Sequence, residues 1–270
     1  MDEYPGAAAA YSLRLLNTDY TGDAIVVRRS SDNTTQSIGF VDGELDVDTL
    51  NTFCTGTNGF VTTWFDQSGN GNNSTQTTAS SQPKIFDSVT GVIEINGKPS
   101  INFSGTGHLK TADTGVDALI EQIQIVAYMN SQVTAASSAK QLLNTYGSVG
   151  FEGLAFGGVT GSLTDETFTI LNNGPAREAI TDVIDIGLHL FSIDWDGSQH
   201  NIYLDSNTGN YISVDTPVQL NSRQIAIGTR LGTSIFNFGG QMQEIILYAS
   251  DQSSNITGIE TNINDFYSIY

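Results

Sequence analysis

The sequence predicts an all-β protein, built as a two-sheet antiparallel sandwich with a short helix near its C-terminus. Short apolar or alternating runs recur along the chain, turn residues separate them about every 8–12 residues, and strand–helix–strand alternation does not occur. Charged residues make up 14% of the chain, against roughly 25% in an average soluble domain. Ser, Thr, Asn and Gln must therefore supply much of the polar surface, and these residues suit strands and turns better than helices.

The expected strands are short runs bounded by Gly, Asn or Asp. They cover residues 24–29, 59–65, 101–103, 122–128, 151–156, 224–228 and 243–248. The clearest hairpin joins 188–195 to 200–204, because Asp196-Gly197 supplies the positive φ angles of a tight turn. This hairpin anchors the prediction of antiparallel pairing.

Helix signals are confined to two places. Asp46 or Asp48 is suited to cap a short helix that ends near Phe53. Ser253 or Ser254 is suited to cap a terminal helix. In that segment apolar residues recur at helical spacing: Ile256, Ile259, Ile263 and Phe266.

One domain accounts for the whole chain, residues 1–270, because an all-β domain can run to roughly 200–250 residues. Residues 1–10 are expected to form an N-terminal arm. Cys54 is the only cysteine, so an intrachain disulfide is impossible and the residue is expected in the core. The N-terminus lacks the basic region of a secretory signal, which predicts folding in a reducing cytosol.

The charge balance restricts the partners. The chain has 29 acidic and 10 basic side chains, a net charge of −19. Such a surface cannot neutralise a run of phosphates, so the sequence predicts no nucleic-acid partner. Anionic membrane surfaces are excluded for the same reason, and no apolar run is long enough to span a bilayer.

The most distinctive stretch is WFDQSGNGNNSTQ, residues 64–76. Oxygen-bearing side chains fall at every second residue, at Asp66, Ser68, Asn70 and Asn72, as in the first half of a calcium-binding loop. Thr77 stands where that loop needs a bidentate Glu. A Gly-rich turn in which the Asp66 carboxylate accepts backbone N–H groups explains the pattern equally. Apart from this Ca²⁺ alternative, no cofactor is expected.

Two tryptophans are candidate carbohydrate-binding residues. An aromatic face suits the apolar side of a sugar ring, which makes Trp64 and Trp195 candidate stacking platforms. Both stand inside apolar strand runs, so a place in the core is the alternative for each. The histidines offer no comparable signal, and His189 is interpreted as a strand residue on an exposed face.

Several of these stretches resemble a known family. Residues 28–40, RRSSDNTTQSIGF, and 53–73, FCTGTNGFVTTWFDQSGNGNN, resemble the catalytic domain of fungal arabinofuranosidase-B-type enzymes. Residues 7–33 resemble modules of bacteriophage virion proteins that belong to the concanavalin A-like lectin domains, and 189–207 follows the laminin-G-like pattern. The resemblance is specific over residues 8–76 and diffuse after 110. It implies a concanavalin A-like jelly roll.

The resemblance also implies where hydrolytic carboxylates would lie. A retaining glycosidase needs two carboxyl groups, a nucleophile and an acid/base. Matching residues 151–158 to the hydrolases brings the nucleophile position to Leu171, and matching 225–230 brings the acid/base position to Arg230. Neither residue is a carboxylate, and an arginine stays protonated. Arg230 is therefore retained as a candidate carbohydrate-binding residue, and the chain is predicted not to be an enzyme.

Two functions remain open from the sequence. The favoured one is a non-catalytic virion module of a bacteriophage, a capsid decoration, head-fibre or tail component assembled in the bacterial cytosol and exposed on the particle. Its expected partners are other virion proteins, a host-surface glycan and further copies of the chain in a homo-oligomer. The alternative is an arabinofuranosidase-like glycoside hydrolase, with a displaced carboxylate pair such as Glu152 with Asp165 or Glu166.

Overall fold

The computed structural model describes residues 1–112, 119–130, 140–144, 155–158, 168–171, 177–180, 184–195, 200–208, 218–219, 224–229 and 237–270. The strands of the first half are β1 (Ala7–Ser12), β2 (Ile25–Arg29), β3 (Thr35–Ile38), β4 (Phe40–Val41), β5 (Glu44–Leu45), β6 (Gly59–Trp64), β7 (Ser74–Thr75), β8 (Lys84–Asp87), β9 (Gly91–Val92), β10 (Glu94–Ile95), β11 (Lys98–Pro99), β12 (Ile101–Asn102), β13 (Leu109–Lys110) and β14 (Leu119–Ile120). The later strands are β15 (Gln122–Met129), β16 (Lys140–Asn144), β17 (Ala155–Gly158), β18 (Phe168–Leu171), β19 (Arg177–Ile180), β20 (Gly187–Trp195), β21 (His200–Leu204), β22 (Asn207–Thr208), β23 (Val218–Gln219), β24 (Ala226–Ile227) and β25 (Gln241–Tyr248). The helices are α1 (Val47–Cys54) and α2 (Ile256–Tyr267), with 3-10 turns at Ala79–Ser81 and Ser253–Asn255.

The strands form two antiparallel layers that are continuous at one side. In the first layer, β20 pairs with β15 and β21, β15 pairs with β25, and β25 pairs with β1. The second layer runs in the order β3-β2-β6-β7-β13-β24-β16-β17-β18-β19. Strands β12 and β8 join them, because β12 pairs with both β25 and β8, and β8 pairs with β6. The predicted all-β antiparallel sandwich is confirmed.

The main hydrophobic core lies between the two layers, and we call it the sandwich core. The first layer contributes Ile125, Phe191 and Ile245, and the second contributes Val27 and Leu109. Every one of these side chains is fully buried. Because successive residues of a strand point to opposite faces, each strand places alternate residues in this core.

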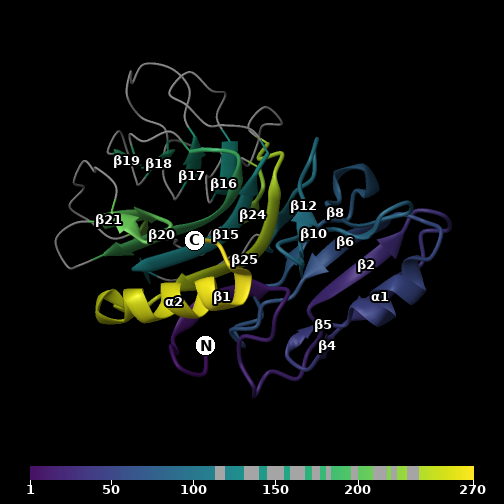
Figure 1. Ribbon diagram of the computed structural model, residues 1–270, viewed down its shortest axis with the longest axis horizontal. Helices are drawn as coiled ribbons and strands as arrows, with labels where there is room; N and C mark the ends of the chain where they lie inside the picture. Colours follow the sequence, from purple (N-terminus) through teal and green to yellow (C-terminus); the bar gives the residue numbers. More distant parts are fainter. Residues whose placement is uncertain are drawn as a thin grey trace.

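A second core lies on the other side of the first layer, beneath α2, and we call it the outer core. Figure 1 shows α2 lying across β1 and β25 on the side where the N-terminus also lies. On β25, Ile246 and Tyr248 point into the outer core, whereas Ile245 and Leu247 point into the sandwich core. The first layer is therefore buried on both faces.

Both predicted helices form close to their expected bounds. The side chain of Asp46 accepts a hydrogen bond from the Thr49 backbone N–H at 2.9 Å, which makes Asp46 the cap of α1. At α2 the expected serine caps are wrong, because Asn255 holds the cap position and makes no side-chain cap bond. The 3-10 turn that precedes α2 is stabilised instead by Asp251, whose carboxylate accepts from the Ser253 N–H at 2.9 Å.

Two further expectations need correction or fall partly outside the described residues. The N-terminal arm expected over 1–10 is wrong for residues 7–10, which belong to the buried strand β1. Of the strand expected at 151–156, residues 155–156 lie in β17 and 151–154 lie outside the described residues. Within the described ranges, no helix is long and apolar enough to cross a membrane.

Candidate functional site

The loop from Asp66 to Asn72 is organised around one buried carboxylate. Oδ1 of Asp66 accepts hydrogen bonds from the backbone N–H of Ala10 at 2.8 Å and of Ser68 at 2.9 Å. Oδ2 accepts from the Ser68 hydroxyl at 2.8 Å and from the Asn72 N–H at 2.9 Å. A carboxylate offers about four acceptor sites, so these four donors use the capacity of Asp66.

The other candidate metal ligands of this loop also make bonds within the protein. The side-chain amides of Asn70 and Asn72 both donate to the carbonyl of Ala8, at 3.1 and 3.0 Å. The loop therefore fastens β6 to the start of β1. Among the residues that the structure describes, no group of three or more His, Cys, Asp or Glu side chains is arranged to hold a metal ion. The hydrogen-bonded turn is the alternative that this geometry favours.

Trp64 lies inside the sandwich core. Its side chain is fully buried and its ring centroid lies 5.8 Å from that of Tyr11. A sugar cannot reach this ring, so the assignment of Trp64 as a carbohydrate-binding residue is wrong and the core alternative is confirmed. Cys54 is likewise buried, as expected, and burial raises the pKa of its thiol to about 11.

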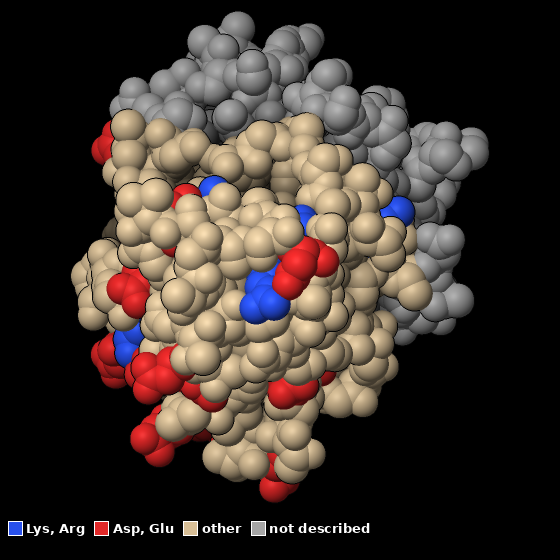
Figure 2. Space-filling model, turned by 90° about the vertical axis from the view of Figure 1, so that its right-hand side faces the viewer, with Lys and Arg blue, Asp and Glu red and all other residues tan. Residues whose placement is uncertain are grey.

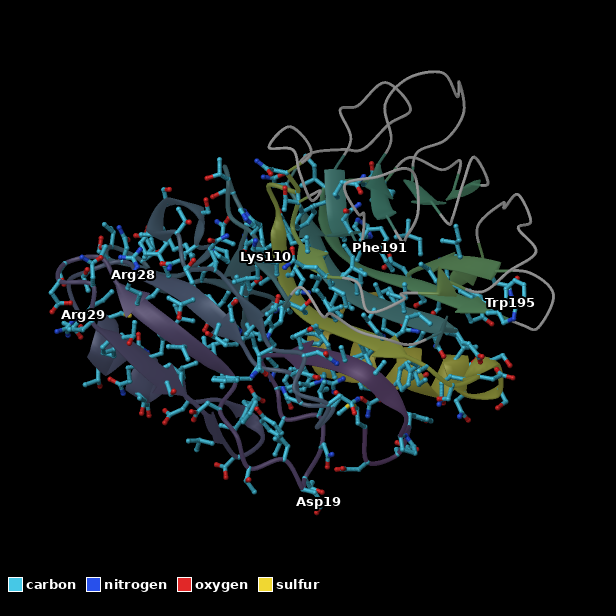
Figure 3. All side chains as sticks on the ribbon, turned by 180° about the vertical axis from the view of Figure 1, so that it is seen from behind. Asp19, Arg28, Arg29, Lys110, Phe191 and Trp195 are labelled. Carbon is cyan, nitrogen blue, oxygen red and sulfur yellow. The ribbon has the colours of Figure 1, made fainter. Side chains whose placement is uncertain are left out.

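Trp195 is only half-buried, at the end of β20. Figure 3 shows it at the opposite end of the molecule from Arg28 and Arg29. Arg230, the third candidate, lies outside the described residues, although β24 ends at Ile227 nearby in the sequence. The structure therefore does not bring the three predicted carbohydrate-binding residues together in the part of the chain that it describes.

The second layer aligns a row of residues that sequence reasoning did not find. Strand register connects ten positions on ten neighbouring strands, from β3 to β19: Ser37, Val26, Thr63, Thr75, Lys110, Ala226, Asn144, Ala155, Leu171 and Arg177. Residues next to this row, such as Val27, Leu109 and Ile227, point into the sandwich core. From β3 to β24 the row therefore marks the opposite face of the layer.

We call the part of this face over β3, β2, β6, β7 and β13 the open face. Ser37, Thr75 and Lys110 are exposed there, and Val26 and Thr63 are half-buried. Arg28 shares the open face: its guanidinium lies over Phe60, 5.1 Å from the ring centroid. It donates to the Gln82 amide oxygen at 2.6 Å and to the Asn33 amide oxygen at 2.9 Å.

Two cations of this face have no acidic partner. Among the described residues, Arg28 and Lys110 make no salt bridge, whereas Arg29 binds Asp32 at 2.6 Å and Lys84 binds Asp87 at 3.2 Å. Figure 3 shows Arg28 and Lys110 well apart along the second layer. Figure 2 shows that one side of the molecule is largely uncharged, with acidic side chains gathered toward its lower left.

The two positions at which the resemblance expects hydrolase carboxylates, Leu171 and Arg230, lie in this row or follow one of its strands in the sequence. Leu171 stands in the row through its pairing with Ala155, and Arg230 follows β24, which contributes Ala226 to it. All ten residues of the row are other than Asp and Glu. The displaced carboxylates considered from the sequence, Glu152, Asp165 and Glu166, lie outside the described residues.

The architecture defines a class of protein: an antiparallel sandwich with one face covered by a helix and one open face of hydroxyl, amide and isolated basic side chains. Neutral hydroxyl and amide groups can donate to and accept from sugar hydroxyls, and the plane of an Arg guanidinium can lie against a sugar ring. Such a surface suits a neutral polyhydroxylated ligand better than a phosphate-rich one.

Comparisons with known proteins agree with this class. Residues 2–98 match the family model described as alpha-L-arabinofuranosidase B, catalytic. A probable alpha-L-arabinofuranosidase B of Aspergillus flavus is 31% identical over 124 residues, which cover 41% of this chain and 24% of that protein. The sequence similarity therefore lies in the N-terminal part that the resemblance singled out.

Solved structures extend the similarity to the fold of almost the whole chain. An arabinofuranosidase complexed with arabinofuranosyl-alpha-1,2-xylobiose superposes with a TM-score of 0.63 and 18% identity, over 94% of this chain and 62% of that one. A GH54 arabinofuranosidase soaked with a cyclic sulfate inhibitor gives 0.64 and 16% over the same shares. At this identity the likeness concerns the fold alone. The chain spans less than two thirds of these enzymes and about a quarter of the Aspergillus protein.

Proposed function

We propose that the chain is an arabinofuranosidase-B-like domain that takes arabinofuranose-bearing glycans as its ligands. The observation that carries this proposal is the agreement of two independent similarities, the family match of residues 2–98 and the shared fold over 94% of the chain. The open face, with its hydroxyl-bearing residues and its two cations without acidic partners, is the surface on which we place the glycan.

Hydrolysis of the arabinofuranosidic bond is the first activity to test, because the matched family and the superposed structures are hydrolases. The reaction would need two carboxyl groups about 5–5.5 Å apart if it retains configuration. The row of the second layer carries no carboxylate, so these groups would have to come from residues outside the row. Glu152 with Asp165 or Glu166 is the pair we propose for that role.

A non-catalytic module on a bacteriophage particle is the second proposal. The presence of Leu171 where the resemblance puts the nucleophile favours a module without catalysis, and the placement on a particle rests on the sequence resemblance alone. In this case the domain binds a host-surface glycan without cleaving it and associates with other virion proteins. Purified virions that contain the chain would support this placement.

Two assays on the intact chain separate these functions. The first measures nitrophenol release from 4-nitrophenyl α-L-arabinofuranoside, and the second measures retardation in a native gel that contains arabinan. Release that disappears in Glu152→Gln or Glu166→Gln supports the hydrolase. Retardation without release supports the binding module, and the absence of both overturns the proposed ligand class.

A further inference from the structure

A cavity of about 290 Å³ lies on the outer side of the first layer, between the N-terminal residues, β25 and α2. Its aliphatic lining comes from Leu16, Ile246, Ile259 and Ile263. The first layer separates this cavity from the sandwich core, and the open face belongs to the second layer (Figure 1). The cavity is therefore a different place on the molecule from the proposed glycan surface.

The polar wall of the cavity is held rigidly by its own contacts. The Arg14 guanidinium donates twice to the Glu244 carboxylate, at 2.8 and 3.0 Å. The Asp2 carboxylate accepts from the Thr18 N–H at 3.0 and 3.1 Å. These contacts leave little freedom for the wall to collapse into the cavity.

Tyr4 lines the cavity on the N-terminal side and lies against α2. Gly258 makes this approach possible, since a Cβ atom at that position would overlap the Tyr4 hydroxyl. A glycine inside a helix costs about 1 kcal/mol relative to alanine. The close packing of Tyr4 against α2 is therefore a structural reason for a glycine at position 258.

Two polar groups of the lining make no hydrogen bond to the described part of the protein. The Tyr248 side chain is 1% exposed, and its hydroxyl makes no hydrogen bond in the part of the chain that the structure describes. The Asn262 amide, on α2, is exposed and makes none either. Burial, with the nearby Glu244 carboxylate, raises the pKa of Tyr248, so its hydroxyl stays a neutral donor and acceptor. Both residues line the cavity, so a ligand that enters it can bond to these groups in place of water.

The charges of the lining restrict the ligand to a neutral one. Asp2 and Glu3 line the cavity and repel an anion, and both cations of the lining are engaged, Arg14 by the Glu244 carboxylate and the Met1 ammonium by the Leu16 carbonyl. The volume is at the small end of ligand sites, so an oligosaccharide does not fit. We propose that this cavity binds one neutral monosaccharide, whose C–H groups lie on the aliphatic lining and whose hydroxyls bond to Tyr248 and Asn262. The proposal does not rest on the function proposed above.

The test is a titration of the intact, ¹⁵N-labelled chain followed by amide chemical shifts. The probe is L-arabinose, and L-arabinonate of nearly the same size serves as the charged comparison. We expect saturable shifts at the amides of Tyr4, Leu16 and Asn262 with arabinose and none with arabinonate. Absence of saturable shifts at these amides overturns the proposal, as does equal binding of the anion.

Matched variants identify the groups responsible. Tyr248→Phe removes only the hydroxyl, and Asn262→Ala removes the exposed amide; each should weaken binding by about fivefold or more. Tyr128→Phe makes the same chemical change on the neighbouring strand β15, beside the outer core but outside the cavity lining, and should bind as the parent does. If Tyr248→Phe and Asn262→Ala both bind as tightly as Tyr128→Phe, the assignment of the site is wrong.

Discussion

The sandwich core and the outer core lie on opposite faces of β1, β15, β20 and β25, yet they are built from different chemistry. The sandwich core contains aliphatic and aromatic residues on every strand that contributes to it, such as Ile125, Phe191 and Ile245. The outer core combines apolar residues with an ion pair, in which Glu244 is 1% and Arg14 is 11% exposed. Alternation along the strands supplies residues to both cores, and a specific polar contact distinguishes the outer core.

The ion pair ties together distant parts of the chain. Arg14 and Glu244 are 230 residues apart. Glu244 also accepts from the Ser12 hydroxyl at 2.8 Å and from the Tyr267 hydroxyl at 3.1 Å, and the Arg14 guanidinium lies 4.9 Å from the ring centroid of Phe266. The pair thus connects β1, β25 and the end of α2. We infer that the outer core depends on this contact more than on any single apolar residue.

The largest effect is expected from breaking the ion pair. Glu244→Ala leaves the buried Arg14 charge without its partner, and removal of one member of a buried pair costs about 3–5 kcal/mol. Urea unfolding of the variant and the parent measures this difference.

An exposed ion pair provides the control. Arg29 and Asp32 make a bond of 2.6 Å at the surface, where such pairs contribute about 0–1 kcal/mol. Asp32→Ala should therefore change the free energy of unfolding far less than Glu244→Ala. Similar losses in the two variants would show that the outer core does not depend on its charges.

The next prediction compares neighbouring residues on β25. Ile245→Ala creates a cavity in the sandwich core and should cost about 2–5 kcal/mol. Ile246→Ala should cost less, near the lower end of that range, because Ile246 already borders the 290 Å³ cavity and has fewer contacts to lose. Equal or reversed losses in urea unfolding would mean that the two cores are packed alike.

A smaller effect is expected at the loop that fastens β6 to β1. Asp66→Ala leaves buried N–H groups without an acceptor and should destabilise by about 1–3 kcal/mol. The exposed Thr77→Ala, at the position where a calcium loop would need its bidentate ligand, should stay within about 0.5 kcal/mol. The melting temperature should not respond to EDTA or to Ca²⁺. A melting temperature that climbs with millimolar Ca²⁺ would restore the metal alternative.

The smallest effect concerns His189 and follows pH. Burial lowers the pKa of His189, but the hydrogen bond at 2.7 Å to Asp205 and the charges of Asp205 and Asp185 outweigh it, so the pKa is raised. The protonated form is therefore favoured in the folded chain. This contribution is complete below the unfolded value of 6.5 and disappears as pH rises through the folded pKa. His189→Asn should remove that part of the pH dependence of unfolding, and an unchanged profile would contradict the assignment.

Local signals explain which parts of the fold could be predicted. The hairpin of β20 and β21 and the helix α1 were predicted because a tight turn and a capping aspartate act over a few residues. The arm expected over 1–10 was wrong for residues 7–10 because the alanine run of β1 carries a weak hydrophobic signal and its partner β25 lies at the other end of the chain. Pairing between strands so far apart in the sequence produces no signal in a local sequence pattern.

In the candidate site, too, only the features with a local sequence signal could be predicted. The turn around Asp66 was among the alternatives, since Asp, Ser and Gly at short spacing favour it. The open face was not found, because it depends on the register of strands from β3 to β13 rather than on any one segment. Trp64 was misplaced because a tryptophan in an apolar run has the same sequence pattern on either face, and burial alone decides its role.

One measurement tests the central claim, that this sandwich takes arabinofuranose-bearing glycans. The melting temperature of the intact chain is recorded with increasing arabino-oligosaccharide and, separately, with xylo-oligosaccharide of the same length. A ligand that binds only the folded state raises the melting temperature by mass action. The account predicts a saturable rise with the arabinose polymer alone. The same response to both sugars, or none to either, would contradict it.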